Sequence, residues 1–112
     1  MLKRDENSPF GETVVSAAQF APVVNVVVNS QMTIITVGTM SAPMTLNAQI
    51  ASTVKPNAHL LVKLTSDANA HDVTLGQGFV GGIIQGTATK TKYAKFVFDG
   101  SAFIHLETDV LN

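Results

Sequence analysis

A glycine pattern is the first feature of this sequence that could do chemistry. Residues 76–81 (GQGFVG) match the G-x-G-x-x-G pattern of dinucleotide-binding loops. That pattern binds a pyrophosphate where a helix follows its last glycine. The chain continues instead as residues 82–87 (GIIQGT), which favour a strand or a loop. We therefore predict a glycine-rich turn with close chain packing and no nucleotide site.

A second candidate site is the group Asp67, Asn69, His71 and Asp72, whose oxygen atoms are of the kind that bind calcium. The helical calcium loop requires a glutamate at its twelfth position, and that position is Gly78 here. Asp and Asn also stabilise turns through their own side chains. We predict a turn, and weak binding of a divalent ion by Asp67, Asn69 and Asp72 remains the alternative.

The three histidines, His59, His71 and His105, are far apart in the sequence. A metal site would need two of them to converge, and no serine lies in the context of a nucleophile elbow. We expect each histidine on a solvated face of a strand. There is no cysteine, so thiolate sites and disulfides are excluded. The prediction is that the chain has no catalytic, cofactor or metal site.

Lys90, Lys92 and Lys95, near Tyr93, form the one basic cluster. The formal net charge is −1, whereas a nucleic-acid-binding protein carries a basic excess. A binder of single strands would also interleave more aromatic residues with the charges. We predict that nucleic acid is not a partner and that the lysines mark a charged strand edge.

The longest informative stretch is Thr13–Val54, which contains no Asp, Glu, Lys, Arg or His. General acid–base chemistry needs a titratable side chain, and this stretch contains none. It therefore cannot supply a general acid or base. It can pair strands and bury apolar faces. The stretch favours a structural or assembly protein over an enzyme.

The elements expected around these residues are strands. Residues 44–50 alternate apolar and polar side chains, and residues 24–28 and 60–65 show a similar period of two. Residues 32–37 are apolar on both faces, which predicts a central strand or one that packs on a second chain. With 112 residues, we expect a flexible arm over residues 1–12 and a single domain over residues 13–112. The predicted fold is an all-β antiparallel β-sandwich, jelly-roll-like, with eight or nine short strands.

The last hairpin is predicted from Tyr93–Phe98 and the strand that starts near Ala102. A two-residue loop would place Phe96 and Phe98 on one face with Ser101, Phe103 and His105. A three-residue loop would place Ala94, Phe96 and Phe98 with Ala102, Ile104 and Leu106. The second face is wholly apolar, so we predict the three-residue loop, with Phe96, Phe98 and Ile104 facing inward.

The segment Ala58–Glu107 contains an LLVKLTSD strand, the run HDVTLGQGF, a GTATKTKYAKFVFDG hairpin and a final FIHLE strand. In this order and pattern it resembles small β-sandwich modules of tailed bacteriophage virions, namely head decoration or auxiliary capsid proteins, head fibres and some tail-fibre modules. The resemblance implies a jelly-roll-like fold, symmetric oligomers and attachment to a capsid lattice. It covers roughly the C-terminal half, and the first 22 residues share none of it.

The resulting functional prediction is a structural virion protein, a capsid decoration, auxiliary or head-fibre subunit without catalysis. The expected partners are the major capsid protein or another virion protein and further copies in a homotrimer, with no membrane. The protein would be made in the host cytoplasm and lie on the capsid surface. The alternative is a carbohydrate- or receptor-binding module of a phage fibre. Predicted interface residues are Leu2, Lys3, Arg4 and Phe10 of an anchoring arm, and Met32, Ile34, Ile35 and Val37.

Overall fold

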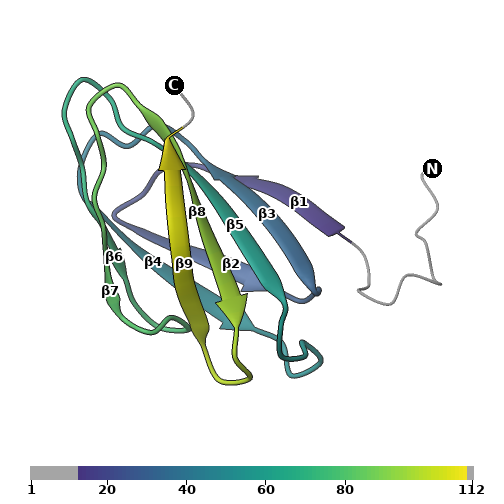
Figure 1. The fold of residues 1–112 in the computed structure, drawn as a ribbon. Helices are drawn as coiled ribbons and strands as arrows, with labels where there is room; N and C mark the ends of the chain where they lie inside the picture. Colours follow the sequence, from purple (N-terminus) through teal and green to yellow (C-terminus); the bar gives the residue numbers. More distant parts are fainter. Residues whose placement is uncertain (1–12, 111–112) are drawn as a thin grey trace, which may run out of the picture.

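Two β-sheets face one another in the computed structural model, which describes residues 13–110 (Figure 1). The five-stranded sheet has the order β1 (Thr13–Ala18), β3 (Met32–Val37), β5 (His59–Thr65), β8 (Thr91–Phe98) and β9 (Phe103–Val110). The four-stranded sheet has the order β2 (Val23–Val28), β4 (Met44–Ile50), β6 (Val73–Leu75) and β7 (Gly82–Ile84). The all-β prediction and the upper strand number of nine are confirmed for this part of the chain.

The antiparallel, jelly-roll-like arrangement is wrong, because both sheets are mixed. The chain crosses to the opposite sheet after each of its first five strands, so that β1, β3 and β5 run parallel, as do β2, β4 and β6. Antiparallel pairing joins β5 to β8, β6 to β7 and β8 to β9. Side-chain alternation identifies the buried face of a strand but not the direction of its neighbour. The short connections 19–22 and 29–31 cross between the sheets and do not form hairpins.

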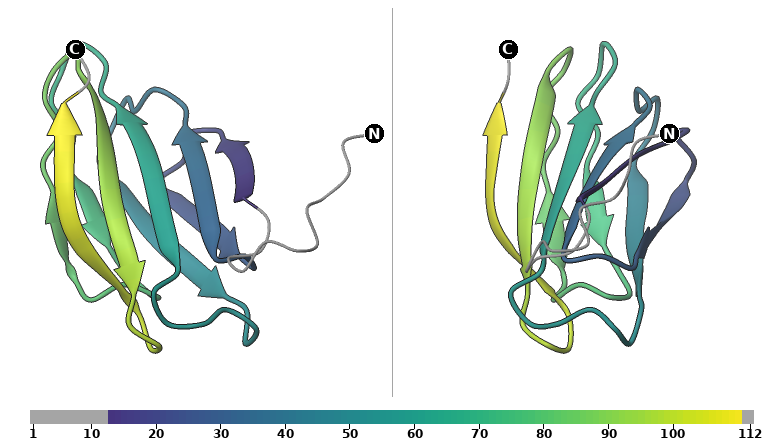
Figure 2. Two further views of the ribbon diagram at one scale, coloured as in Figure 1. Left: turned by 45° about the vertical axis from the view of Figure 1, so that its right-hand side comes forward. Right: turned by 90° about the vertical axis from the view of Figure 1, so that its right-hand side faces the viewer.

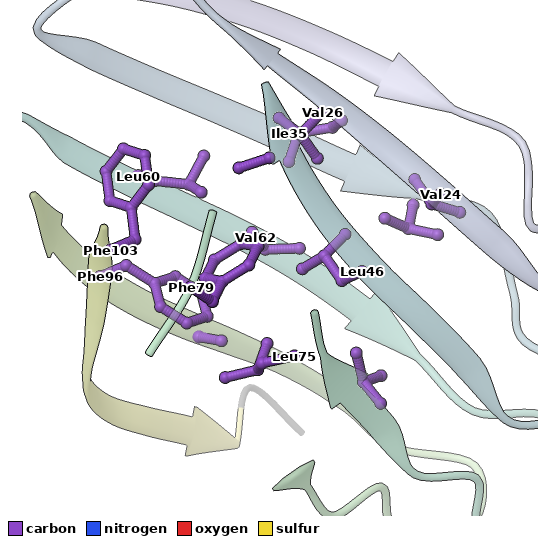
Figure 3. Packing of buried hydrophobic residues seen from close by; sticks show 14 of the residues in the cluster. Val24, Val26, Ile35, Leu46, Leu60, Val62, Leu75, Phe79, Phe96 and Phe103 are labelled. Carbon is purple, nitrogen blue, oxygen red and sulfur yellow. The ribbon is translucent and has the colours of Figure 1, made fainter. Parts of the chain in front are cut away.

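The core lies between the sheets and is built from alternate residues of the longer strands. Val24, Val26 and Val28 of β2 are buried in one cluster with inward residues of the five-stranded sheet. Ile35, Leu60 and Phe96 are among them (Figure 3). Aromatic rings fill one end, where the Phe79 and Phe96 centroids are 4.9 Å apart. Fully burying one such side chain contributes about 1.5–3 kcal/mol to folding. The apolar alternation of the sequence is therefore explained by burial within one chain.

The last hairpin differs from its prediction in register. Phe98 pairs with Phe103, so the loop holds the four residues 99–102, and Phe96 pairs with His105. Phe103 is fully buried, whereas Ile104 is 37 % exposed. The inward positions of Phe96 and Phe98 are confirmed, but that of Ile104 is wrong. The apolar pattern did not predict which face of the hairpin is buried, because Ile104 belongs to an apolar surface on the outside of the sheet.

Asp99 determines the shape of this loop. Its Oδ1 accepts hydrogen bonds from the N–H groups of Ser101 (2.8 Å) and Ala102 (2.9 Å), and its own N–H donates to the Ala102 carbonyl (3.1 Å). The N–H groups of Ala102 and Ser101 lower the pKa of the Asp99 carboxyl. The loop therefore favours the ionised carboxylate, as in other Asp-stabilised turns.

We expect Asp99→Ala to lower the melting temperature at neutral pH. A pKa that is depressed in the folded state gives stability that is present above the unfolded-state pKa and is lost as the pH falls through the folded-state pKa. The difference between wild type and Asp99→Ala should therefore shrink in acid. Thermal melts of both proteins from pH 7 down to about pH 2 measure it. Ser101→Ala, at an exposed neighbour, is the control, and a difference independent of pH would contradict the assignment.

Candidate functional site

The titratable side chains are dispersed over the part of the chain that the structure describes. Among residues 13–110, no group of three or more His, Asp and Glu side chains is placed to hold a metal ion. His59 and His105 are exposed on β5 and β9, which confirms their predicted positions. The prediction for His71 is wrong, because His71 precedes β6 in a loop and its side chain is only 12 % exposed.

The predicted turn at Asp67 is confirmed. The N–H of Asn69 donates to Oδ1 of Asp67 at 3.0 Å, and Nε2 of His71 lies 2.8 Å from the same oxygen. The Asn69 N–H is the largest cause of a lowered pKa at Asp67, and His71 adds to it. The carboxylate thus closes the loop between β5 and β6, which explains why the loop is rich in Asp and Asn.

The glycine-rich segment is the loop between β6 and β7, and its chain packs closely, as predicted. Gly78 has φ +88°, and a Cβ there would collide with the carbonyl oxygen of Ala48. The N–H of Ala48 donates to the Gln77 carbonyl (2.8 Å), and the N–H of Phe103 donates to the Gly78 carbonyl (2.9 Å). Consecutive residues therefore bond to β4 of one sheet and β9 of the other. Backbone contact explains the glycines here without a bound phosphate.

The lysine cluster is not at a sheet edge, so that part of its prediction is wrong. Lys95 lies on β8, between β5 and β9, and its Nζ is 3.1 Å from Asp109 and 3.4 Å from Glu107. Asp109, and then Glu107, raise the pKa of Lys95. Nζ of Lys92 donates to the Gln85 carbonyl at 2.9 Å. These two lysines bind neighbouring strands and loops, and the exposed acids of β9 form the charged edge.

The outer face of the five-stranded sheet contains an open hollow of about 420 Å³, which we name the apolar hollow. A bulge creates part of it. Lys95 pairs with Glu107 and Phe96 with His105, which leaves Leu106 without a partner in the ladder. The Leu106 side chain is exposed and lines the hollow. The lining residues are Met32, His59, Leu60, Leu61, Lys95, Phe96 and Leu106.

The surroundings of the apolar hollow divide into apolar and charged parts. Ile34 lies beside Leu61 in the ladder, and Val97 lies beside Ile104, so apolar side chains extend from the hollow along the sheet. The other side carries Lys95 and its two acidic partners. An apolar centre with a polar, charged rim is the usual anatomy of a protein–protein interface. The hollow is therefore a surface suited to hold a partner's apolar side chain.

The outer face of the four-stranded sheet has a different character. Its ladder rows place Val23 beside Thr45, Asn25 beside Asn47 and Val27 beside Gln49, with Thr74 and Ile83 beyond. None of these side chains is ionisable. Nδ2 of Asn47 donates to Oδ1 of Asn25 at 3.3 Å, and the N–H of Gln77 donates to Oδ1 of Asn47 at 2.8 Å. We call this the charge-free face.

The predicted interface residues separate into three groups. Leu2, Lys3, Arg4 and Phe10 lie outside the described residues. Met32 and Ile34 are half-buried on the outer face of β3, at and beside the apolar hollow. Ile35 and Val37 are 4 % and 2 % exposed within the core between the sheets, so the structure removes them from the predicted interface. β3 is apolar on both faces because it is central in its sheet and its outer side borders the hollow.

Sequence reasoning missed Leu61 and Leu106. Leu61 departs from the alternation of β5, since it shares its face with His59 and Lys63. An apolar residue among polar ones on the same face was the available signal. Leu106 had no such signal, because its position depends on the bulge.

Comparison with models of protein families, with curated proteins and with solved structures finds no match for this chain. The long apolar helix that a membrane span would require is not found among the described residues.

Proposed function

We propose that this protein is a structural subunit of a bacteriophage virion, of the capsid decoration, auxiliary or head-fibre type. It acts by binding the major capsid protein or another virion protein on the capsid surface, without catalysis. The observation that carries the proposal is the apolar hollow with its charged rim. The resemblance of residues 58–107 to virion modules is the reason for proposing a phage virion as the assembly.

The apolar hollow offers binding energy in a form that suits a protein partner. Leu61 of β5 and Leu106 of β9 line the depression from either side of β8, and Met32 of β3 lines it as well. Covering one such side chain contributes about 1.5–3 kcal/mol before the costs of association. The ion pairs of Lys95 at the rim would orient the partner more than they would add affinity, since exposed pairs contribute little.

We expect Leu106→Asp and Leu61→Asp to weaken attachment at least tenfold, because a charge would then have to be desolvated in the interface. The assay adds purified protein to phage particles assembled without it and measures bound copies across a concentration series. Ile83→Asp is the matched control, since Ile83 is an exposed aliphatic residue on the charge-free face.

Two results would contradict attachment through the apolar hollow. If wild-type protein does not bind the particles, the proposed function is wrong. If Ile83→Asp abolishes binding and Leu106→Asp does not, the attachment surface is the charge-free face, and the hollow has another role.

A carbohydrate- or receptor-binding module is the second candidate, and one observation favours it. The charge-free face turns the amide groups of Asn25 and Asn47 outward, next to Gln49 and Gln77. Amide side chains donate and accept hydrogen bonds, as sugar hydroxyls require. A glycan array decides this, and binding that is lost in Asn25→Ala would support it.

A further inference from the structure

β1 and β2 are the first strands of the two sheets and lie on the same side of the molecule, away from β9 (Figure 2). Among residues 13–110, β1 is hydrogen-bonded in its ladder to β3, and β2 to β4, and neither has a second neighbour strand. Each therefore has one edge that no described strand pairs. We name these the two N-terminal edges. Unpaired edges can pair with strands of other chains.

The N-terminal edges lack the features that normally prevent such pairing. β1 (TVVSAA) and β2 (VVNVVV) contain no charge and no proline, and their ladders are regular over six residues. The opposite edges are protected. β9 carries Glu107, Asp109 and a bulge, and β7 is only three residues long. Proteins blunt edges with charges, bulges and short strands, so the contrast within this chain is specific to one end.

Side chains on the N-terminal edges are exposed and apolar. Val15 of β1 is 70 % exposed, and Val23 and Val27 of β2 are 50 % and 60 % exposed. β1 contains no buried residue, and Ser16 is exposed although it lies beside the buried Ile35 in the ladder. Only Val14 and Ala18 of β1 are partly buried, so this strand gains little from folding within its own chain. The exposed apolar side chains of β1 and β2 would therefore gain stability from being covered by a partner.

We propose that the cover is a second copy of this chain, with β1 pairing antiparallel to β1 of the second copy and β2 to its β2. One two-fold axis perpendicular to the sheets can produce both contacts, because both edges are at the same end of the sandwich. Each sheet then continues across the contact. Two six-residue edges supply about a dozen backbone hydrogen bonds, comparable with a typical interface.

A second copy fits these edges better than an unrelated chain for two reasons. The edges carry no charge, so like surfaces meet without repulsion. The exposed valines of one copy would also meet those of the other, as a self-complementary contact requires. The inference goes beyond the proposed function, because it concerns copies of this chain and holds whichever partner binds the apolar hollow. It predicts an even number of copies, in place of the homotrimer expected from the sequence.

Single cysteines test the contact directly, because the chain has no cysteine of its own. Val15→Cys and Val27→Cys are expected to cross-link into dimers with a short bifunctional maleimide at micromolar protein. Ile104→Cys, an exposed aliphatic position on the opposite edge strand of the same sheet, is the control and should stay monomeric under denaturing electrophoresis. Equal cross-linking at all three positions would overturn the proposal.

Light scattering of the full chain provides the second readout. The wild type and Ile104→Lys should have the mass of two copies, and the double variant Val15→Lys and Val27→Lys the mass of one, because edge lysines oppose strand pairing. A wild-type monomer, as when residues 1–12 cover the edges, or a trimer would overturn the proposal and leave the proposed function standing. If the double variant does not fold, the cysteine cross-links decide.

Discussion

Replacing Phe103 with alanine is expected to lower the free energy of unfolding by about 3–5 kcal/mol. Phe103 is fully buried, and its ring centroid lies 5.4 Å from that of Phe98 and 6.1 Å from that of Phe79. Its backbone also bonds to Gly78 and Val80, so it joins the glycine-rich loop between β6 and β7 to β9. This loss is a large share of the stability of a small domain. Denaturant unfolding measures it as a lower midpoint at an unchanged slope.

Ile104→Ala is the matched control, one residue further along the same strand. Ile104 is on the outer face, so its truncation should change the stability by less than about 1 kcal/mol. The apolar pattern of the sequence predicts the opposite order, with Ile104 inside. A larger loss for Ile104→Ala than for Phe103→Ala would show that the three-residue loop is right and that the register of the structure is wrong.

Gly78→Ala is expected to have the second large effect. The left-handed backbone at φ +88° costs a non-glycine residue about 1–2 kcal/mol. The new Cβ would also collide with the backbone of Ala48, and relief by local movement costs about 1–3 kcal/mol more. Neither the Ala48 backbone nor the glycine-rich loop can move freely, because hydrogen bonds fix both. Thermal melts should therefore show a strong decrease for Gly78→Ala.

Gly81→Ala tests whether this cost is specific to position 78. An added Cβ at Gly81 meets nothing within 4 Å. The substitution should leave the stability unchanged or raise it by up to about 1 kcal/mol, since alanine restricts the unfolded chain. Equal destabilisation by the two variants would mean that the glycines serve a common purpose that backbone packing does not explain.

The strands themselves could be predicted because one face of each is buried. Residues 44–50 alternate without a fault, and the structure buries Met44, Leu46 and Ala48 while their neighbours face outward. The Asp67 turn was also predictable, since it depends on local chemistry. In these cases the determining interaction lies within a few residues of sequence or within one strand.

Strand direction could not be predicted, because it depends on where a connection leads. Residues 19–22 and 29–31 are short enough for hairpin loops, yet they cross between the sheets and make the neighbouring strands parallel. The prediction of the hairpin register was wrong for a related reason. Ile104 and Leu106 are apolar because they form an outer surface, and a pattern alone does not separate an outer surface from a core.

The candidate site was predictable in part. Met32 and Ile34 were singled out from the two-sided apolar strand, and they lie at and beside the apolar hollow. The hollow also needs Leu61 from β5 and Leu106 from the bulge of β9, which are far from Met32 in the sequence. Only the fold brings these three strands together in one sheet.

Counting the copies of this protein in purified phage particles tests whether it is a structural subunit of the virion. Quantitative mass spectrometry of particles, normalised to the major capsid protein, is the measurement. If the protein is a structural subunit of the virion, it should be present at a fixed ratio that repeats between preparations and survives salt washing, because an apolar contact is weakly screened by salt. Absence of the protein from washed particles, with the protein abundant in the lysate, would show that it is not a subunit of the virion.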